Sequence, residues 1–412
     1  MKRRVVIVAA VVWMMVVVAI ASSAVAVKLA GEDGAGVTRL VSQEDYETLQ
    51  RYRRLEEVRS TLMDNYYLPL DEEDLVTGAI RGMMDSVGDP YTFYYTVEEM
   101  QAQNEHSSGV YHGVGMGVQI TSDGGIEIIR VYEGSPAKSA GLEAGDRITA
   151  VDGVKVSGEN GQTLNEAVQL IQGEDGTQVT LAILRNGVEQ DVTLTRSAVN
   201  VSYVEYSLIN ANIGYVNIVQ FTGDDVSGFR EALDAFKGAG VSGMIVDLRG
   251  NPGGLLDDVV KIADMVLPEG IVTYVEDGHG NREDQMSSAE YWDIPMVVLV
   301  NGGSASASEL FTAAVQDYDR GTIVGTKTFG KGIVQTLITF ADDGAGMQLT
   351  TASYFSPKGR TIHGTGVEPD VVVELSEDSR VSSINPNPDE DNQLAVALEE
   401  LQKRIDAYEK AA

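Results

Sequence analysis

Two short, almost wholly apolar runs, at residues 244–248 and 296–300, constrain the fold of this chain more than any other feature. Each precedes a segment with the apolar spacing of an amphipathic helix. A strand that is apolar on both faces has to be covered on both faces, and helices supply that cover. The sequence therefore predicts an α/β core over residues 200–375. Its expected strands are 213–219, 244–248, 296–300 and 322–324, and its expected helices are 226–237, 255–266 and one that starts at Ser304.

Residues 107–197 show a different pattern, in which short β-rich runs are separated by turn residues. Asn186-Gly187 between two such runs is typical of a two-residue hairpin turn. This segment is therefore predicted to be a compact α+β module. Its expected strands are 126–129, 179–185 and 188–194, and its expected helix is 163–172.

Residues 1–28 indicate where the chain resides. Three basic residues at 2–4 precede an uncharged run at 5–27, which is long enough to cross about 30 Å of hydrocarbon as a helix. The basic residues are expected to keep the N-terminus in the cytoplasm, so that the rest is exported. A cleaved signal peptide is the alternative, because Ala24-Val25-Ala26 fits a small-x-small cleavage site. Both interpretations place the bulk of the chain outside the cytoplasm.

Helical segments are expected on both sides of these modules. Residues 38–105 are predicted to form a helical N-terminal domain, with an amphipathic helix over 42–65 and a second that opens near Asp71. The turn Gly88-Asp89-Pro90 ends the second helix. Residues 388–412 are predicted to hold a terminal amphipathic helix behind an acidic linker.

Composition excludes several classes of function. The 412 residues carry a formal net charge of −32, which disfavours binding to nucleic acid through a basic face. The chain has no cysteine, and this excludes disulfides, thiolate metal sites and a cysteine nucleophile. With only four histidines, no metal or other cofactor is expected.

A match to a phosphate-binding loop at residues 325–331 is incomplete. The run has the pattern G-x-x-x-x-G-K, but Gly332 stands where Ser or Thr would have to hold magnesium. Nucleotide binding is therefore not expected.

Ser306 lies in the segment 301–309, which joins a predicted buried strand to the helix that follows it. Small residues there let another backbone approach, and unpaired N–H groups at a helix start can stabilise a developing oxyanion. A serine at this junction is placed to act as a nucleophile. The alternative is structural, because Ser306-x-x-Glu309 is a capping box that needs no chemistry. The G-x-S-x-G pattern of the α/β-hydrolases is absent.

Lys331 is the candidate base for such a serine, since none of the histidines has a suggestive context. It lies between two glycines and directly before an apolar strand. Burial would have to lower its pKa from about 10.4 to about 7 for it to accept a proton. In a regular strand, Gln335 would lie on the same side as Lys331 and could orient its amine. The alternative is an exposed lysine in a turn.

The loop at residues 247–254 follows an apolar strand and precedes a helix, which is where α/β sheets build their sites. Its glycines could donate a backbone N–H to an oxyanion, or could form a simple turn.

Together these motifs resemble the C-terminal processing peptidases, also called tail-specific proteases. The resemblance rests on D-L-R-x-N-P-G-G at 247–254, S-A-S-A-S-E at 304–309, F-G-K-G-x-V-Q at 329–335 and G-T-G-V-E-P-D at 364–370. It implies a multidomain α/β plus α+β protein: a membrane helix, a helical N-terminal segment, a PDZ domain and a ClpP/crotonase-like core.

The resemblance also implies roles for individual residues. Ser306 would be the nucleophile, Lys331 the general base and Gln335 the group that orients the base. The oxyanion donors would be the N–H groups of Ala307 and of either Gly253 or Gly254. Asp317 matches an aspartate discussed as functional in some relatives, and it is interpreted here as structural.

In the PDZ-like module, Gly113-Val114-Gly115-Met116 resembles the loop that binds a peptide's terminal carboxylate. The chain is therefore expected to be an extracytoplasmic serine endopeptidase that selects protein or peptide substrates by accessible C-terminal tails. Dimer contacts through the terminal helices are a further implication of the resemblance. A non-catalytic PDZ adaptor is the alternative.

Overall fold

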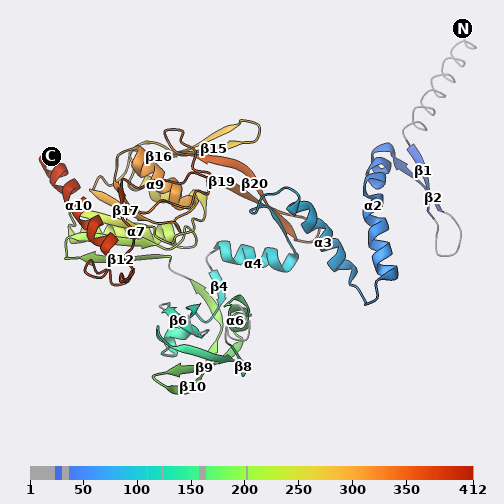
Figure 1. The fold of residues 1–412 in the computed structure, drawn as a ribbon, viewed down its shortest axis with the longest axis horizontal. Helices are drawn as coiled ribbons and strands as arrows, with labels where there is room; N and C mark the ends of the chain where they lie inside the picture. The colour runs from blue at the N-terminus through green and yellow to red at the C-terminus, as the bar shows by residue number, and fades with distance from the viewer. Residues whose placement is uncertain are drawn as a thin grey trace, which may run out of the picture. The chain divides into compact units, whose positions relative to one another are not determined.

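The computed structural model describes residues 24–29, 37–108, 110–121, 125–132, 134–156, 164–200 and 203–411. The chain divides into two units, residues 1–88 and 89–412 (Figure 1). Most of the expected membrane helix, residues 1–23, lies outside the described residues. Its last residues belong to strand β1 (Ala24–Leu29), which pairs with β2 (Val37–Ser42). No helix within the described ranges has the length and apolar character needed to cross a membrane.

The first unit contains the two expected helices, α2 (Gln43–Asn65) and α3 (Glu72–Asp85). Each start is capped, since Ser42 Oγ accepts from the Asp45 N–H at 3.0 Å and the Asp71 carboxylate accepts from the Glu73 N–H at 2.8 Å. Neither helix has a buried residue. The apolar stripe of α2 is therefore exposed in the single chain; it includes Leu49, Tyr52, Leu55 and Val58.

The α+β module forms a sheet with the strand order β10-β9-β7-β6-β5, and β8 pairs with β7. Its strands are β5 (Met116–Ile120), β6 (Ile126–Val131), β7 (Arg147–Val151), β8 (Val154–Lys155), β9 (Gln178–Arg185) and β10 (Val188–Thr195), and its helices are α5 (Pro136–Ser139) and α6 (Leu164–Ile171). Asn186 and Gly187 both have positive φ and join paired strands, which confirms the expected hairpin. Strands β4 (Val110–Gly113) and β11 (Ser197–Asn200) pair where the chain enters and leaves the module.

The core contains a six-stranded sheet with the order β12-β13-β14-β17-β18-β21, parallel from β13 onward. Its strands are β12 (Val204–Ile209), β13 (Ile213–Ile218), β14 (Gly243–Asp247), β17 (Met296–Val300), β18 (Thr322–Gly325) and β21 (Val371–Val372). Strands β14 and β17 are buried along their whole length. These are the apolar runs from which a covered sheet was expected.

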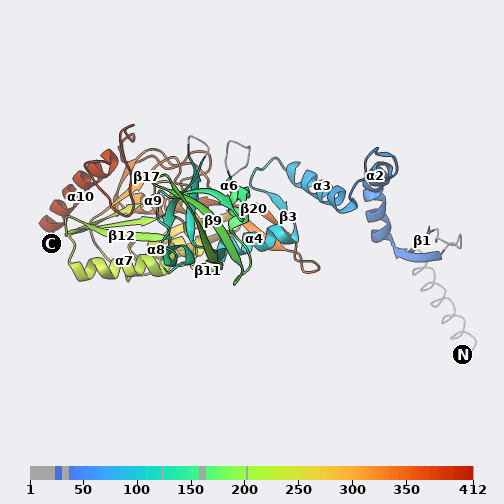
Figure 2. The same cartoon turned by 90° about the horizontal axis from the view of Figure 1, so that it is seen from below.

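Helices cover both faces of this sheet, which confirms the expectation (Figure 2). On one face α7 (Asp225–Ala239), α8 (Leu256–Asp264) and α9 (Ala307–Asp317) pack on Val246 and Val298. On the other, the C-terminal helix α10 (Asn392–Ala411) packs on Ile245 and Val297. Successive residues of each strand thus face different helices.

A second sheet in this unit has the order β16-β15-β20-β19, and β3 pairs with β20. Its strands are β15 (Gly270–Asp277), β16 (Arg282–Ser287), β19 (Ile333–Thr339), β20 (Gly346–Phe355) and β3 (Phe93–Tyr95), and helix α4 (Val97–Ser108) follows β3. The pairing brings the segment before β3 to the strands that follow Lys331. The sequence analysis did not predict this sheet apart from the apolar start of β19.

Candidate active site

Ser306 is the residue on which the candidate site is centred. It is the N-cap of α9, at the junction with buried strand β17, and it is 9% exposed. Its backbone has φ +53° and ψ −116°, a conformation that costs a non-glycine residue about 1–3 kcal/mol. Such strain persists only where the surrounding structure enforces it. The turn is therefore sharp and strained although the G-x-S-x-G pattern is absent.

The Glu309 carboxylate connects Ser306 to the segment that carries Lys331. This fully buried group accepts hydrogen bonds from the backbone N–H groups of Ser306 (2.9 Å), Gly330 (2.7 Å) and Lys331 (2.8 Å). It also accepts from Thr328 Oγ1 at 2.5 Å. The carboxylate half of the expected capping box therefore forms, and Glu309 also holds the lysine loop in place. The sequence signal for Glu309 was the cap alone.

Lys331 is half-buried and lies just before β19. Its Nζ lies 4.4 Å from the centroid of the Tyr91 ring. Burial lowers the pKa of Lys331 below its ordinary value, and the carboxylate of Asp89 opposes this shift. The direction is the one required of a lysine that accepts a proton. Sequence reasoning missed Asp89 and Tyr91 here, because only the turn at 88–90 marked that segment.

Gln335 makes no hydrogen bond to Lys331 among the described residues. Its Nε2 lies 3.4 Å from Thr350 Oγ1 and 3.5 Å from the Ile333 carbonyl oxygen. The expected shared face assumed a regular strand from residue 331, but β19 begins at Ile333 and its pairing with β20 shifts register between Val334 and Gln335. Such a shift changes the alternation of faces. The orienting role of Gln335 stays a prediction.

The glycine loop after β14 lies against Ser306. A Cβ on Gly253 would come within 2.8 Å of Ser306 Cβ and 2.9 Å of the Ala307 nitrogen. The buried side chain of Asn251 holds this loop, because its Oδ1 accepts from the Gly253 N–H at 2.8 Å and its Nδ2 donates to the Ile218 carbonyl at 2.8 Å. The expected neighbours Ser306, Ala307 and Gly253 are therefore together in the structure.

The backbone N–H groups of the expected oxyanion donors differ in whether they already have a hydrogen-bond acceptor. Within the described part of the chain, no acceptor is hydrogen-bonded to the N–H of Ala307 or of Gly254, whereas that of Gly253 is bonded to Asn251. The structure thus favours Gly254 over Gly253 as the second donor in the pair that sequence reasoning left open.

A buried charged network fixes the start of the same loop. Arg249 donates to the Asp247 carboxylate at 2.5 Å and forms an ion pair with Asp391 at 2.8 Å. The Tyr215 hydroxyl also donates to Asp247, at 2.7 Å. Asp391 in turn accepts from the Leu394 N–H at the start of α10, at 3.0 Å. The D-L-R part of the motif is therefore structural and joins the loop to the C-terminal helix.

Asp317, at the far end of α9, also has structural partners. Its carboxylate accepts from Arg360 at 2.5 Å and from the Lys358 N–H at 2.9 Å. These contacts agree with the structural interpretation of this residue.

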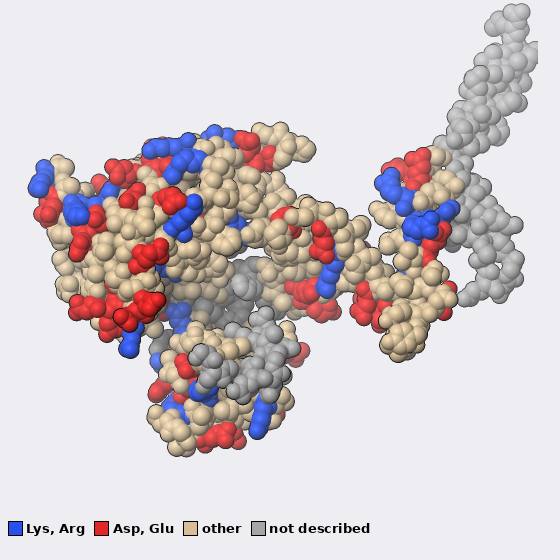
Figure 3. Space-filling view, in the orientation of Figure 1, with Lys and Arg blue, Asp and Glu red and all other residues tan. Residues whose placement is uncertain are grey.

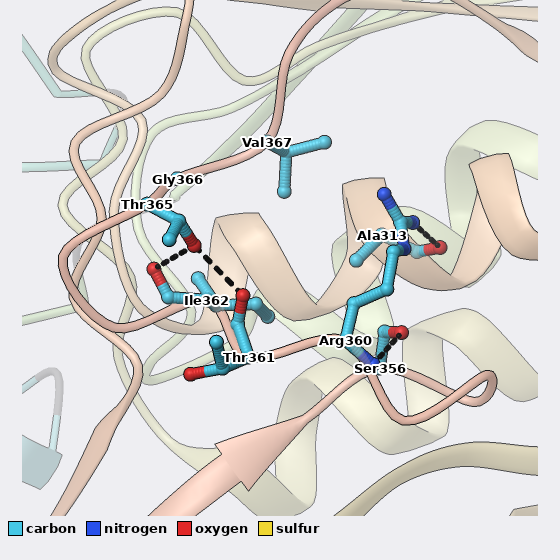
Figure 4. Close-up of a pocket in the computed structure, with 8 residues that line it drawn as sticks. All are labelled: Ala313, Ser356, Arg360, Thr361, Ile362, Thr365, Gly366 and Val367. Atoms are coloured by element: carbon cyan, nitrogen blue, oxygen red, sulfur yellow. Dashed lines mark hydrogen bonds between the residues drawn. The ribbon is translucent and has the colours of Figure 1, made fainter.

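A cavity of about 320 Å³ lies close to Arg360, between α9 and residues 356–367 (Figure 4). Its lining includes Ala313 and Ile362 but neither Ser306 nor Lys331. Arg360 extends along it towards the Ala313 carbonyl, 3.4 Å from one of its nitrogens. The cavity is therefore separate from the candidate catalytic residues.

The expected carboxylate-binding loop, residues 113–116, runs from the last residue of β4 to the first residue of β5, the edge strand of the module's sheet. Gly115 has φ +79°, and Ser135 Oγ donates to its carbonyl at 3.1 Å. The Val114 carbonyl accepts from the Ala137 N–H at 2.8 Å. An edge strand with a fixed loop before it is suited to strand addition by a peptide.

The charge on the surface disfavours nucleic-acid binding. Acidic side chains are spread over the visible face of each unit, as Figure 3 shows. With a formal net charge of −32, the chain offers a phosphate backbone little electrostatic attraction. The described residues hold no group of three or more His, Cys, Asp or Glu suited to a metal ion.

Comparison with known families gives three matches along the chain. Residues 212–373 match the model described as peptidase family S41, and residues 127–185 match the PDZ domain. Residues 9–99 match the N-terminal domain of the activating protease CtpB.

Individual relatives match over most of the chain. A carboxy-terminal-processing protease from Bartonella bacilliformis is 35% identical over 81% of this chain and 78% of its own length. A probable CtpA-like serine protease from Staphylococcus saprophyticus is 36% identical over 82% of this chain and 69% of its own length. Among solved structures, a putative S41 protease from Bacteroides fragilis is similar in fold. It covers 84% of this chain and 97% of its own, with a TM-score of 0.55 and 17% identity.

Proposed function

The chain belongs to the carboxy-terminal-processing peptidases of family S41, with a PDZ domain and serine-type peptidase activity, and we propose that Ser306 and Lys331 form its catalytic dyad. The observation that carries this proposal is the strained backbone of Ser306, which one buried carboxylate, Glu309, ties to the Lys331 segment. A serine that only capped the helix would need neither a strained backbone nor a connection to the Lys331 segment.

The proposed reaction is acyl transfer through Ser306. Its Oγ attacks the scissile carbonyl carbon while the neutral Lys331 amine takes the hydroxyl proton. The oxyanion is stabilised by the N–H groups of Ala307 and Gly254. Lys331 then returns its proton to the leaving amine, which departs and leaves an ester on Ser306. Water, deprotonated by the same amine, hydrolyses the ester and restores both groups.

The dyad has to close before this reaction can start. Among the described residues no hydrogen bond joins Lys331 Nζ to Ser306, and the amine lies over the Tyr91 ring, 4.4 Å from its centroid. Catalytic hydrogen bonds are often long without substrate and tighten in the Michaelis complex. Gln335 would orient the amine towards Ser306.

The PDZ module is proposed to bind the C-terminal tail of the substrate. The loop 113–116 would bind the terminal carboxylate, and the tail would add as a strand beside β5. The apolar run at 5–27 supports a membrane-anchored or exported enzyme whose catalytic part lies outside the cytoplasm. The exposed apolar stripe of α2 is consistent with a homodimer.

The test compares the purified full chain in detergent with its Ser306→Ala and Lys331→Ala variants. The substrate is an unfolded protein with an apolar C-terminal tail, and a second substrate has a charged tail. Cleavage by the wild type alone, faster for the apolar tail, is expected. Cleavage by either variant at the wild-type rate would overturn the dyad. Equal cleavage of both tails would overturn tail selection but leave the dyad intact.

A further inference from the structure

The segment from Asp89 to Thr92 is held firmly in its place next to Lys331. The Asp89 carboxylate accepts from the Tyr91 N–H at 3.0 Å and from Thr92 Oγ1 at 2.7 Å, which closes a tight turn. Strand β20 holds this turn from the other side: the Thr350 N–H donates to Thr92 Oγ1 at 3.1 Å, and Gln348 Nε2 donates to the Tyr91 carbonyl at 3.0 Å.

The same part of β20 also faces the residues after Lys331. Thr350 pairs with Gln335 across the β19–β20 ladder, and its hydroxyl lies 3.4 Å from Gln335 Nε2. The turn with Tyr91, the lysine and the glutamine are therefore fixed to one another through a single pair of strands. A ring on such a support has a defined position relative to Lys331.

We propose that Tyr91 is a positioning residue for the peptidase reaction, whose ring face holds the Lys331 amine while the Asp89 turn fixes the ring. The proposal rests on Lys331 as the general base. A lysine side chain has four rotatable bonds, so a half-buried amine needs a surface that limits its positions. The ring of Tyr91, 4.4 Å from Nζ, is that surface.

The ring also has an electrostatic effect in the direction that the reaction needs. Lys331 is neutral before it takes the serine proton and positive afterwards. The face of an aromatic ring attracts a cation, so Tyr91 stabilises the charge that develops in the transition state. The other titratable groups here are the Asp89 carboxylate and, beside it, the His363 side chain. The Glu309 carboxylate is bonded to the Lys331 backbone N–H.

The test measures kcat and KM of the full chain and its variants between pH 6 and 10. The substrate is an internally quenched peptide with an apolar tail. Tyr91→Leu keeps the burial but removes the ring, and is expected to lower kcat about 10–100-fold with KM unchanged. It should also move the acid limb of the kcat–pH profile about 0.5 to 1 pH unit lower, because the ring stabilises the protonated form of Lys331 and its loss lowers the pKa of the amine.

Two variants serve as controls. Tyr91→Phe retains the ring face and should keep the wild-type kcat and acid limb. Phe93→Leu, in the same segment with its ring edge-on to Tyr95, should also keep them. If circular dichroism shows that Tyr91→Leu is not folded, Tyr91→Met replaces it, with the same expected changes in kcat and in the acid limb.

The proposal would be overturned if Tyr91→Leu kept the wild-type kcat or the wild-type acid limb. It would also be overturned if Tyr91→Phe lost as much kcat as Tyr91→Leu, or if Tyr91→Leu raised KM and left kcat unchanged. The last would make Tyr91 a substrate contact. Failure of the dyad itself would be seen separately, as turnover by Lys331→Ala.

Discussion

Replacing Gly253 with alanine tests whether the glycine loop has to approach the nucleophile closely. The added Cβ would lie 2.7 Å from the Ala305 carbonyl oxygen, 2.8 Å from Ser306 Cβ and 2.9 Å from the Ala307 nitrogen. Two of these neighbours are backbone atoms, which cannot move aside without distorting the Ser306 turn. The methyl group would also crowd the nitrogen of Ala307, whose N–H is one of the proposed oxyanion donors.

The expected size of the effect follows from the loss of one oxyanion donor, which lowers kcat about 10²–10³-fold. Gly253 also has φ +104°, a conformation that costs alanine about 1–3 kcal/mol. The free energy of unfolding should therefore fall by a similar amount, and Tm by several degrees.

Gly250→Ala is the matched control, because it adds the same backbone strain without the steric contact with the Ser306 turn. Gly250 lies in the same loop with φ +71°, yet an added Cβ would meet nothing within 4 Å. This variant should lose stability but keep kcat within a few-fold. Peptide cleavage kinetics and thermal unfolding measure both effects. A Gly253→Ala enzyme with wild-type kcat, or equal loss of kcat in the two variants, would refute the close approach.

Three further predictions follow from other parts of the molecule. Because burial lowers the pKa of Lys331, kcat should rise with pH to a plateau reached below the ordinary lysine pKa of about 10.4, and a pH-independent rate would contradict this. Burial and the nearby Asp258 raise the pKa of Asp225 to about 7, so wild-type stability should fall as pH rises from about 4 to 7. Asp225→Asn should therefore unfold at the wild-type temperature near pH 4 and gain up to about 4 kcal/mol above pH 7; calorimetry showing no pH-dependent gain would contradict it. Gly115→Val would place a Cβ 2.1 Å from that of Ser135, so calorimetric binding of a tail peptide should weaken at least tenfold while cleavage of a tail-less peptide persists.

Features that depend only on residues close together in the sequence were predictable from it. The apolar runs of β14 and β17 required a sheet covered on both faces, and Asn186-Gly187 required a hairpin. Ser306 and Lys331 became candidates through local context: a strand–helix junction for one and flanking glycines for the other. In each case a short stretch of chain contains the physical cause.

Contacts between distant segments were decided by the tertiary structure. The bonds from Glu309 to the Lys331 segment depend on β17 and β18 lying side by side, and the position of Tyr91 depends on β3 pairing with β20. The register shift at Gln335 is likewise set by the partner strand.

The sequence by itself therefore determined the type of fold, because apolar periodicity and turn residues act locally. Its short motifs carried the resemblance to the peptidase family with a PDZ domain and pointed to the candidate dyad. Tertiary structure alone decided what surrounds the dyad: the Glu309 link, the Tyr91 ring and the close approach of Gly253 to Ser306. The reason is that hydrogen bonds and ring contacts require positions within a few ångströms, and strand order and register fix those positions only when the whole chain has packed.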